Sequence, residues 1–277
     1  MSKLRVLYIS SEINPFIEIT HVADYVRQLP EAMQEKGMEI RILVPRFGSI
    51  NERKNRLHEV VRLSGINIAV GDEEKPLIIK VASIPSAKLQ VYFIDNDDYF
   101  HRKNYFFDKD NNFFEDNDDR LIFFCKGVLE TVKKLGWAPD IIHCNDWLSS
   151  LIPLFIRTHY KKEPIYKNAK TIFTVFNNHF SHKFDTKSFI TKAKMSDLED
   201  SMLSTSGNID YLSLLKIGLT HADAIFKAEK EYSAVHDSLF DEIGARKNFE
   251  YVPALGNIEY YYNIYHELLG IDELVEG

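Results

Sequence analysis

The residues best placed to do chemistry follow the first apolar run of the chain. Residues 4–12, LRVLYISSE, predict a strand, and residues 15–30, PFIEITHVADYVRQLP, predict a loop leading into a helix that begins at Thr20 or His21. In an α/β protein such a turn often binds a phosphate, because glycines let the backbone approach the ligand and the helix N-terminus offers free N–H groups. This turn has no glycine, and the acidic Glu18 occupies a position where a basic residue would favour phosphate binding. We therefore expect the turn to serve folding, with the Thr20 hydroxyl capping the helix.

Carboxylates are densest in residues 95–120, which raises the hypothesis of a metal site. Residues 108–119, DKDNNFFEDNDD, carry oxygen ligands at the first, third and fifth positions of a calcium-binding loop. The segment lacks the glycine that the sharp turn of such a loop needs, and its last position is Asp119 where a bidentate glutamate is expected. We therefore predict no metal here, and instead a solvated loop whose Asp116 and Asn117 cap the helix that follows.

Apolar strand-like runs alternate with helical patterns along most of the chain. This alternation is typical of a mostly parallel sheet covered by helices on both faces, so we predict an α/β fold with a Rossmann-like, doubly wound sheet. Parallel strands are expected at residues 4–10, 39–44, 139–143, 170–175 and 223–226. Three short β-rich runs between residues 57 and 95 are expected to extend the sheet as hairpin strands.

Two helices are predicted from apolar residues that recur at helical spacing. The first covers residues 117–135, ends at Gly136 and should bury one side. Near the C-terminus, Asn257 is expected to cap a helix over residues 257–269 that folds back on the chain's own sheet. Because no repeat, low-complexity tract or linker divides the sequence, we predict that residues 1–277 form a single domain.

Charge and composition disfavour several classes of partner. The 277 residues include 34 Lys and Arg against 41 Asp and Glu, and this net charge of −7 argues against nucleic acid and acidic membranes as partners. Cys125 and Cys144 lie in apolar surroundings without metal-ligand spacing, which favours reduced thiols. The N-terminal apolar run is too short for a signal peptide, and no run approaches the roughly 18 apolar residues of a membrane span. We predict a cytoplasmic protein.

Several stretches together resemble the N-terminal catalytic domain of bacterial glycogen synthases and plant starch synthases. In chain order, over residues 4–240, they are VLYISSEINPF, VADYVRQLPEAM, EIRILVPRFGSI, FEDNDDRLIFFCKGVLE, PDIIHCNDW, TIFTVFNN and LLKIGLTHADAI. The resemblance implies the N-terminal half of a GT-B glycosyltransferase, a fold that holds ADP-glucose between two Rossmann-like halves and an α-1,4-glucan over the N-terminal one. It implies no metal, and we predict no cofactor. Family members continue for about as many residues again, so we expect the C-terminal nucleotide-binding half to be absent from this chain.

This chain departs from the family pattern at the positions that meet substrate. The family's opening turn reads Lys-x-Gly-Gly-Leu-Ala-Asp, and its lysine and glycines are replaced here by Glu18, Thr20 and His21, while Asp24 is kept. Its second signature, His-x-His-Asp-Trp, has Asn145 in place of the second histidine. Its third, Thr-x-His-Asn, loses its histidine to Phe176. The candidate substrate-binding residues are Glu18, Thr20, His21, Asp24, Asp116, Asn145, Asp146, Asn177 and Lys216, and His143 is the catalytic candidate.

Two interpretations compete for His143 and for Trp147, which belong to the same signature. His143 either contacts a sugar or forms hydrogen bonds with the backbone in the wall of the crevice. Trp147 is predicted to be largely buried and mainly structural, as the anchor of the helix after the His143 strand.

Three functions remain open on the sequence. We predict a glycogen/starch synthase-like protein of α-glucan metabolism that binds α-glucan or a protein partner but transfers no glucose by itself. The alternative is an ADP-glucose-dependent α-1,4-glucosyltransferase whose second half is supplied by a separate protein chain. The third is a metal-dependent transferase that would use the carboxylates of Asp95 and Asp97.

Overall fold

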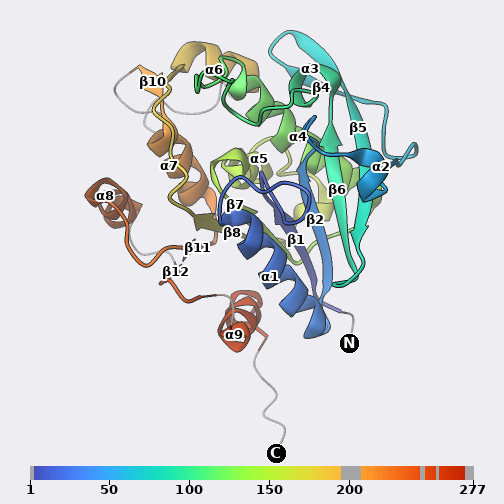
Figure 1. The fold of residues 1–277 in the computed structure, drawn as a ribbon. Helices are drawn as coiled ribbons and strands as arrows, with labels where there is room; N and C mark the ends of the chain where they lie inside the picture. Colours follow the sequence, from blue (N-terminus) through green and yellow to red (C-terminus); the bar gives the residue numbers. More distant parts are fainter. Residues whose placement is uncertain (1–2, 195–206, 244–246, 254–255, 272–277) are drawn as a thin grey trace, which may run out of the picture.

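One mixed sheet forms the centre of the molecule (Figure 1). The computed structural model describes residues 3–194, 207–243, 247–253 and 256–271. The strands of the sheet are β1 (Arg5–Ile9), β2 (Glu39–Pro45), β3 (His58–Glu59), β4 (Ile66–Val70), β5 (Glu73–Ile84), β6 (Leu89–Asp95), β7 (Ile141–Asn145), β8 (Lys170–Val175), β11 (Ala224–Lys227) and β12 (Lys247–Phe249). A separate ribbon joins β9 (Phe184–Asp185) to β10 (Asn208–Ile209).

The order of the strands reverses beside β1. The sheet runs β12-β11-β8-β7-β1-β2-β6-β5-β3, with β4 paired to β5. Every neighbour from β12 to β6 is parallel, whereas β3, β4 and β6 each pair with β5 antiparallel. In open parallel sheets, ligands bind at the carboxyl ends of the strands where the order reverses. Residues that follow β1 and β7 therefore occupy the expected position of a site.

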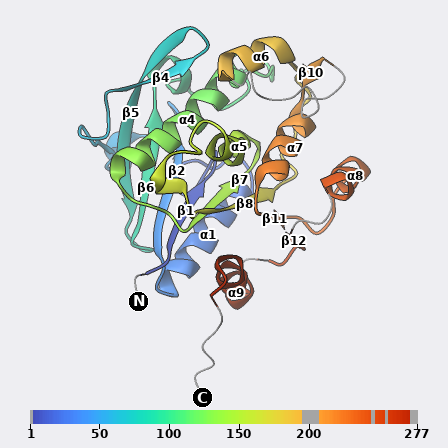
Figure 2. The ribbon, with the colours of Figure 1, turned by 180° about the vertical axis from the view of Figure 1, so that it is seen from behind.

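Helices cover both faces of the sheet. They are α1 (Val22–Glu35), α2 (Glu52–Asn55), α3 (Asp97–Phe100), α4 (Asn117–Leu135), α5 (Leu151–Arg157), α6 (Thr186–Ala193), α7 (Tyr211–His221), α8 (Ala234–Ile243) and α9 (Ile258–Leu269), with short 3-10 turns η1 (Trp147–Ser149) and η2 (Pro164–Tyr166). Figures 1 and 2 show α1 on one face and α4 and α5 on the other. Helix α9 packs beside α1, and α7 packs against α5. In the described part of the chain, no helix has the length and apolar character needed to cross a membrane.

The predicted strands are confirmed within one residue at each end, except one. The strand expected at residues 139–143 lies at Ile141–Asn145, because it pairs with β1 as far as Cys144 and with β8 as far as Asn145. The β-rich runs do extend the sheet, as β3 to β6. Strand β12 was not predicted, since it has only three residues.

The predicted helix at the C-terminus is confirmed, including its return to the sheet. The Tyr265 hydroxyl of α9 lies 2.7 Å from the Tyr8 hydroxyl of β1 and 2.6 Å from Nδ1 of His143 in β7. The predicted cap is wrong, because the Asn257 side chain makes no capping bond and donates instead to the carbonyl of Pro253.

The helix predicted at residues 117–135 is α4, but two details of the prediction are wrong. The Asp116 side chain makes no capping bond, because both of its oxygens accept from the Arg102 guanidinium, at 2.7 and 2.5 Å. Asn117 donates to the carbonyl of Phe106 rather than capping. Instead of burying one side, α4 is buried nearly all round, because β4, α5 and α6 pack against it in addition to the sheet.

Gly218 lets α7 lie close to the sheet, which gives a first prediction. A Cβ at this position would come within 2.7 Å of the Phe173 ring, which is fully buried in β8. We expect Gly218→Ala to destabilise the protein by about 1 to 3 kcal/mol in urea unfolding, because overpacking outweighs the better helix propensity of alanine. The double variant Gly218→Ala, Phe173→Leu should lose less stability than the sum of the losses of the two single variants, because a smaller side chain at 173 makes room for the new Cβ. Strict additivity would contradict the close contact.

Candidate functional site

Asp146 organises the point where the strand order reverses. Its Oδ2 accepts hydrogen bonds from the Ser10 hydroxyl (3.1 Å), the Ser11 N–H (2.9 Å) and the Ser11 hydroxyl (2.7 Å), and its Oδ1 accepts from the Leu148 N–H (2.8 Å). Its backbone has φ 63° and ψ 174°, a conformation that is strained for any residue except glycine. Burial raises the pKa of Asp146 to about 7, although its hydrogen bonds to Ser11 act in the other direction. Asp146 thus fixes the segment after β1 against the segment after β7.

Glu12 fills the place that an anion would take at the opening turn. Its Oε2 accepts hydrogen bonds from the N–H groups of Ile19 and Thr20, both at 2.7 Å, and its Oε1 accepts from the Thr20 hydroxyl at 2.7 Å. The side chain is nearly completely buried, and burial raises its pKa even though these donors lower it. The turn is therefore held by a carboxylate of the chain itself.

Thr20 also satisfies the first N–H group of α1. Its hydroxyl oxygen accepts from the Val22 N–H at 3.2 Å, which confirms that this hydroxyl serves the helix start. The residue before the helix is His21, whose side chain makes no capping bond. Glu12 and Thr20 together therefore occupy three N–H groups at this turn, those of Ile19, Thr20 and Val22.

The other predicted residues of the turn lie at its rim. Glu18 is exposed, and Asp24 accepts a hydrogen bond from the Asn14 amide at 2.9 Å. His21 Nε2 lies 2.6 Å from Oε1 of Glu229, which also accepts from the Asn177 N–H at 3.3 Å. Glu229 thus connects the turn before α1 to the segments that follow β8 and β11.

His143 is enclosed in the sheet rather than open to the crevice, and the expected bonds to the backbone are wrong, because both ring nitrogens meet side-chain hydroxyls. The side chain is completely buried in β7, with Nδ1 2.6 Å from the Tyr265 hydroxyl and Nε2 2.6 Å from the Thr174 hydroxyl. Its ring stacks on Tyr8 at 5.2 Å between centroids. Burial lowers the pKa of His143 to about 3, so the imidazole is neutral at physiological pH.

The remaining predicted residues do not converge on one point. Asn145 is buried in β7, where its amide donates to the carbonyls of Ile9 and His143. Lys216 forms an ion pair with Glu242 of α8 at 2.5 Å. Asp116 is engaged by Arg102, as described above. Asn177 lies at the edge of a hollow, where its amide donates to the carbonyl of Glu231 at 3.0 Å.

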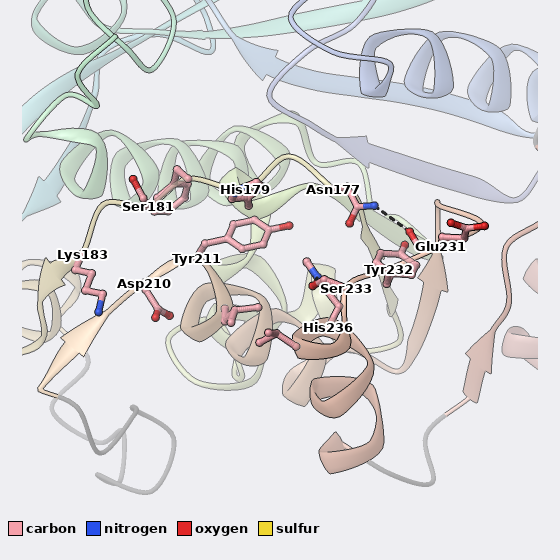
Figure 3. A pocket seen from close by; sticks show the side chains of 13 residues that line it. Asn177, His179, Ser181, Lys183, Asp210, Tyr211, Glu231, Tyr232, Ser233 and His236 are labelled. Atoms are coloured by element: carbon pink, nitrogen blue, oxygen red, sulfur yellow. Dashed lines mark hydrogen bonds between the residues drawn. The ribbon is translucent and has the colours of Figure 1, made fainter.

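Two neighbouring hollows open at this edge of the sheet. The smaller, of about 140 Å³, lies against the opening turn, and Glu12, Thr20, Trp147 and Phe180 contribute to its walls. The larger, of about 630 Å³, is lined by Asn177, His179, Phe180, Tyr211, Tyr232 and His236, among others (Figure 3). Both are lined by His179 and Phe180, so they adjoin. Aromatic walls with a few polar groups are the usual lining of a small-molecule site.

Sequence reasoning missed several of these residues. Glu12 was predicted only as the end of the first strand, and Glu18 was the predicted acidic residue of the turn. Tyr211 and Tyr232 follow β10 and β11, and only the three-dimensional path of those segments places both rings in one hollow. A carboxylate three residues after a buried strand was the available signal for Glu12.

The acidic stretch is engaged in contacts within the protein. Asp95 lies 2.9 Å from Lys80, and Asp97 lies 3.0 Å from His101. Asp108 accepts from the backbone of Asp110 and Asn112, as in a local turn. Among the residues that the structure describes, no group of three or more His, Cys, Asp or Glu side chains is placed to hold a metal ion. Cys125 and Cys144 are buried, free thiols.

The chain is similar in sequence to known glycogen synthases and matches one family model. Residues 5–240 match the family model described as the starch synthase catalytic domain. The glycogen synthase of Pelodictyon phaeoclathratiforme is 40% identical over 238 residues, which is 85% of this chain and 48% of that protein. The glycogen synthase of Chlorobaculum tepidum is 39% identical over 230 residues, 83% of this chain and 46% of that protein. The chain therefore spans about half the length of these relatives.

A solved structure shows the same fold. The catalytic domain of starch synthase IV from Arabidopsis thaliana, bound to ADP and acarbose, superposes with a TM-score of 0.74 and 18% identity, covering 91% of this chain and 52% of that one. This likeness confirms the predicted GT-B half.

Proposed function

The chain belongs to the starch synthase catalytic domain family, and from this we propose that it binds α-glucan at the carboxyl edge of its sheet and transfers no glucose from ADP-glucose by itself. The proposal rests on one observation above all. The N–H groups of Ile19 and Thr20, at the turn where family resemblance puts the sugar nucleotide, already donate to the buried carboxylate of Glu12.

Charge at this turn opposes a diphosphate. Glu12 is buried beneath the turn and Glu18 is exposed at its surface, so an incoming diphosphate would meet two carboxylates. A pair of like unit charges at about 4 Å costs on the order of 4 kcal/mol at an effective dielectric of 20. His21, the residue after Thr20, is paired with Glu229. Because the N–H groups of Ile19, Thr20 and Val22 are already engaged and two carboxylates lie at the turn, the developing charge of a departing diphosphate gains little stabilisation here.

The two hollows supply a better site for a neutral saccharide. Tyr211 and Tyr232 present aromatic surface, and Asn177, Asp210 and His236 present polar atoms (Figure 3). A neutral ligand avoids the repulsion at the turn. The Arabidopsis starch synthase to which this chain is similar in fold was bound to acarbose as well as ADP. These features support α-glucan as the ligand.

Calorimetry and an activity assay test the proposal. We expect the purified chain to bind maltoheptaose but not ADP-glucose in isothermal titration, and to transfer no radiolabel from ADP-glucose to glycogen above a boiled control. The triple variant Glu18→Lys, Thr20→Gly, His21→Gly leaves Glu12 in place but adds a cation and releases the Val22 N–H, so it should gain weak ADP-glucose binding, yet no turnover. Asp24→Asn, at the rim of the same turn, is the control that should gain nothing. Transfer by the unmodified chain would overturn the proposal.

The chain spans about half the length of its relatives, which favours one alternative function. In that alternative a separate chain supplies the second half and completes an ADP-glucose-dependent α-1,4-glucosyltransferase. Transfer that appears only when the separately expressed second half of a glycogen synthase is added would support it.

A further inference from the structure

A third hollow lies at the opposite edge of the sheet from the candidate site. It has a volume of about 410 Å³ and is formed by the C-terminal end of α5, the segment through η2, the start of β8 and Asp223 before β11. Parallel strands begin at this edge and end at the other, so the hollow is separated from the carboxyl-edge site by the length of the strands. A ligand here would not compete directly with one at the candidate site.

Positive charge in this hollow is not neutralised by the protein. Four cations line it, Arg157, Lys161, Lys167 and Lys170, against one carboxylate, that of Asp223. Asp223 is already engaged, because its Oδ2 accepts from the Thr171 N–H at 2.8 Å and its Oδ1 from Arg157 at 3.0 Å.

The three lysines are left without a counter-ion of their own. In the described ranges of the chain, no carboxylate lies within ion-pairing distance of Lys161, Lys167 or Lys170. The nearby Glu163 pairs with Lys133 at 2.8 Å. The chain as a whole carries a net charge of −7, whereas this hollow is lined by three cations that have no carboxylate partner. Such a concentration of charge attracts a multivalent anion.

The wall of the hollow also offers carbon surface. Tyr160 and Tyr166 are buried, and their rings meet edge to face at 5.9 Å. The Tyr166 hydroxyl donates to the Leu129 carbonyl at 2.5 Å, which fixes that ring. A cationic rim over a rigid aromatic wall suits a ligand with a phosphate at one end and a carbon skeleton at the other, and the volume lies in the usual range for small-molecule sites.

We propose that this hollow binds a small phosphate monoester of the sugar-phosphate class, at a second site independent of the proposed glucan site. The lysines contact the dianionic phosphate, and the tyrosine wall contacts the sugar. The inference does not depend on the function proposed above, since no residue is shared between the two sites.

Titration calorimetry with three probes tests the proposal on the purified chain. We expect glucose 1-phosphate to bind at least tenfold more tightly than inorganic phosphate, and AMP to bind less tightly than glucose 1-phosphate, because its base adds volume that must fit the same hollow. Because the contacts are between charges at the surface, affinity should fall several-fold when ionic strength rises from about 0.02 to 0.3 M. Equal affinity for all three probes would mean a nonspecific anion site and would overturn the proposal, and so would tighter binding of AMP.

Matched variants locate the site. Replacing Lys161, Lys167 and Lys170 together with glutamine should weaken glucose 1-phosphate binding more than tenfold. Replacing Lys54, Lys88 and Lys109 with glutamine makes the same change in net charge, and because these three exposed lysines lie outside the hollow, it should leave binding unchanged. Equal losses in the two variants would show that only overall charge matters and would also overturn the proposal. If a variant folds poorly, the affinities of the unmodified chain for the three probes and their dependence on salt still test the proposal.

Discussion

Replacing Trp147 with alanine is expected to lower the free energy of unfolding by about 3 to 5 kcal/mol, as large core truncations do. The predicted burial of this side chain is confirmed, since only 3% of it is exposed. Its ring contacts Phe106 at 4.8 Å, Phe180 at 5.0 Å and Phe113 at 6.0 Å between centroids, so alanine would leave a cavity lined by three aromatic rings. Urea unfolding followed by far-ultraviolet circular dichroism measures the effect without relying on tryptophan fluorescence.

Phe107 offers a matched control from the same aromatic cluster. Its ring contacts Phe113 at 5.2 Å but is 37% exposed, so Phe107→Ala should cost less than about 1 kcal/mol. If Trp147→Ala cost no more than Phe107→Ala, the indole would not be a core residue, and its position in the wall of the smaller hollow would be its main role.

The layout of the sheet could be predicted because buried parallel strands are continuous apolar runs. Strands β1, β2 and β8 were located within one residue for this reason. Strand β12 has three residues, and its pairing with β11 depends on tertiary position rather than on its own sequence pattern. The predicted Asp116 cap was wrong for a related reason. The Asp116 carboxylate pairs with Arg102, and the local sequence does not indicate that these two side chains meet.

The candidate site was predicted less well than the fold. His143 was expected at a strand end because its strand was predicted to stop there, whereas β7 continues to Asn145 and encloses the ring. Glu12 reaches N–H groups seven and eight residues further along the chain, and this contact depends on the path of the intervening loop. Residue type and spacing indicate that a turn exists, but they do not indicate which carboxylate enters it.

His143 and Asp146 should give the stability opposite dependences on pH. The pKa of His143 falls from 6.5 to about 3 on folding, so between these values the unfolded state binds the extra proton, and acidification lowers the free energy of unfolding. The pKa of Asp146 rises from 3.8 to about 7 on folding, so between these values the native state binds the extra proton. Acidification in this range therefore raises the free energy of unfolding. Each effect is about 1.4 kcal/mol per pH unit, so in the unmodified chain the two nearly cancel between about pH 6.5 and 4.5.

Replacing either residue should therefore leave the pH dependence of stability that the other one causes. On acidification from pH 6.5 to 4.5, the stability of His143→Gln should rise by about 2.5 kcal/mol relative to that of the unmodified chain, and the stability of Asp146→Asn should fall by about the same amount. Urea unfolding at the two pH values measures this change, and any constant cost of each substitution drops out of the difference. His58→Gln is the matched control, because that imidazole is exposed. If both variants kept the pH dependence of the unmodified chain, the burial of these two groups would not control their protonation. Shifts of opposite sign would instead establish that folding keeps the His143 imidazole neutral and retains a proton on Asp146. These two buried groups lie three residues apart, at the point where the strand order reverses.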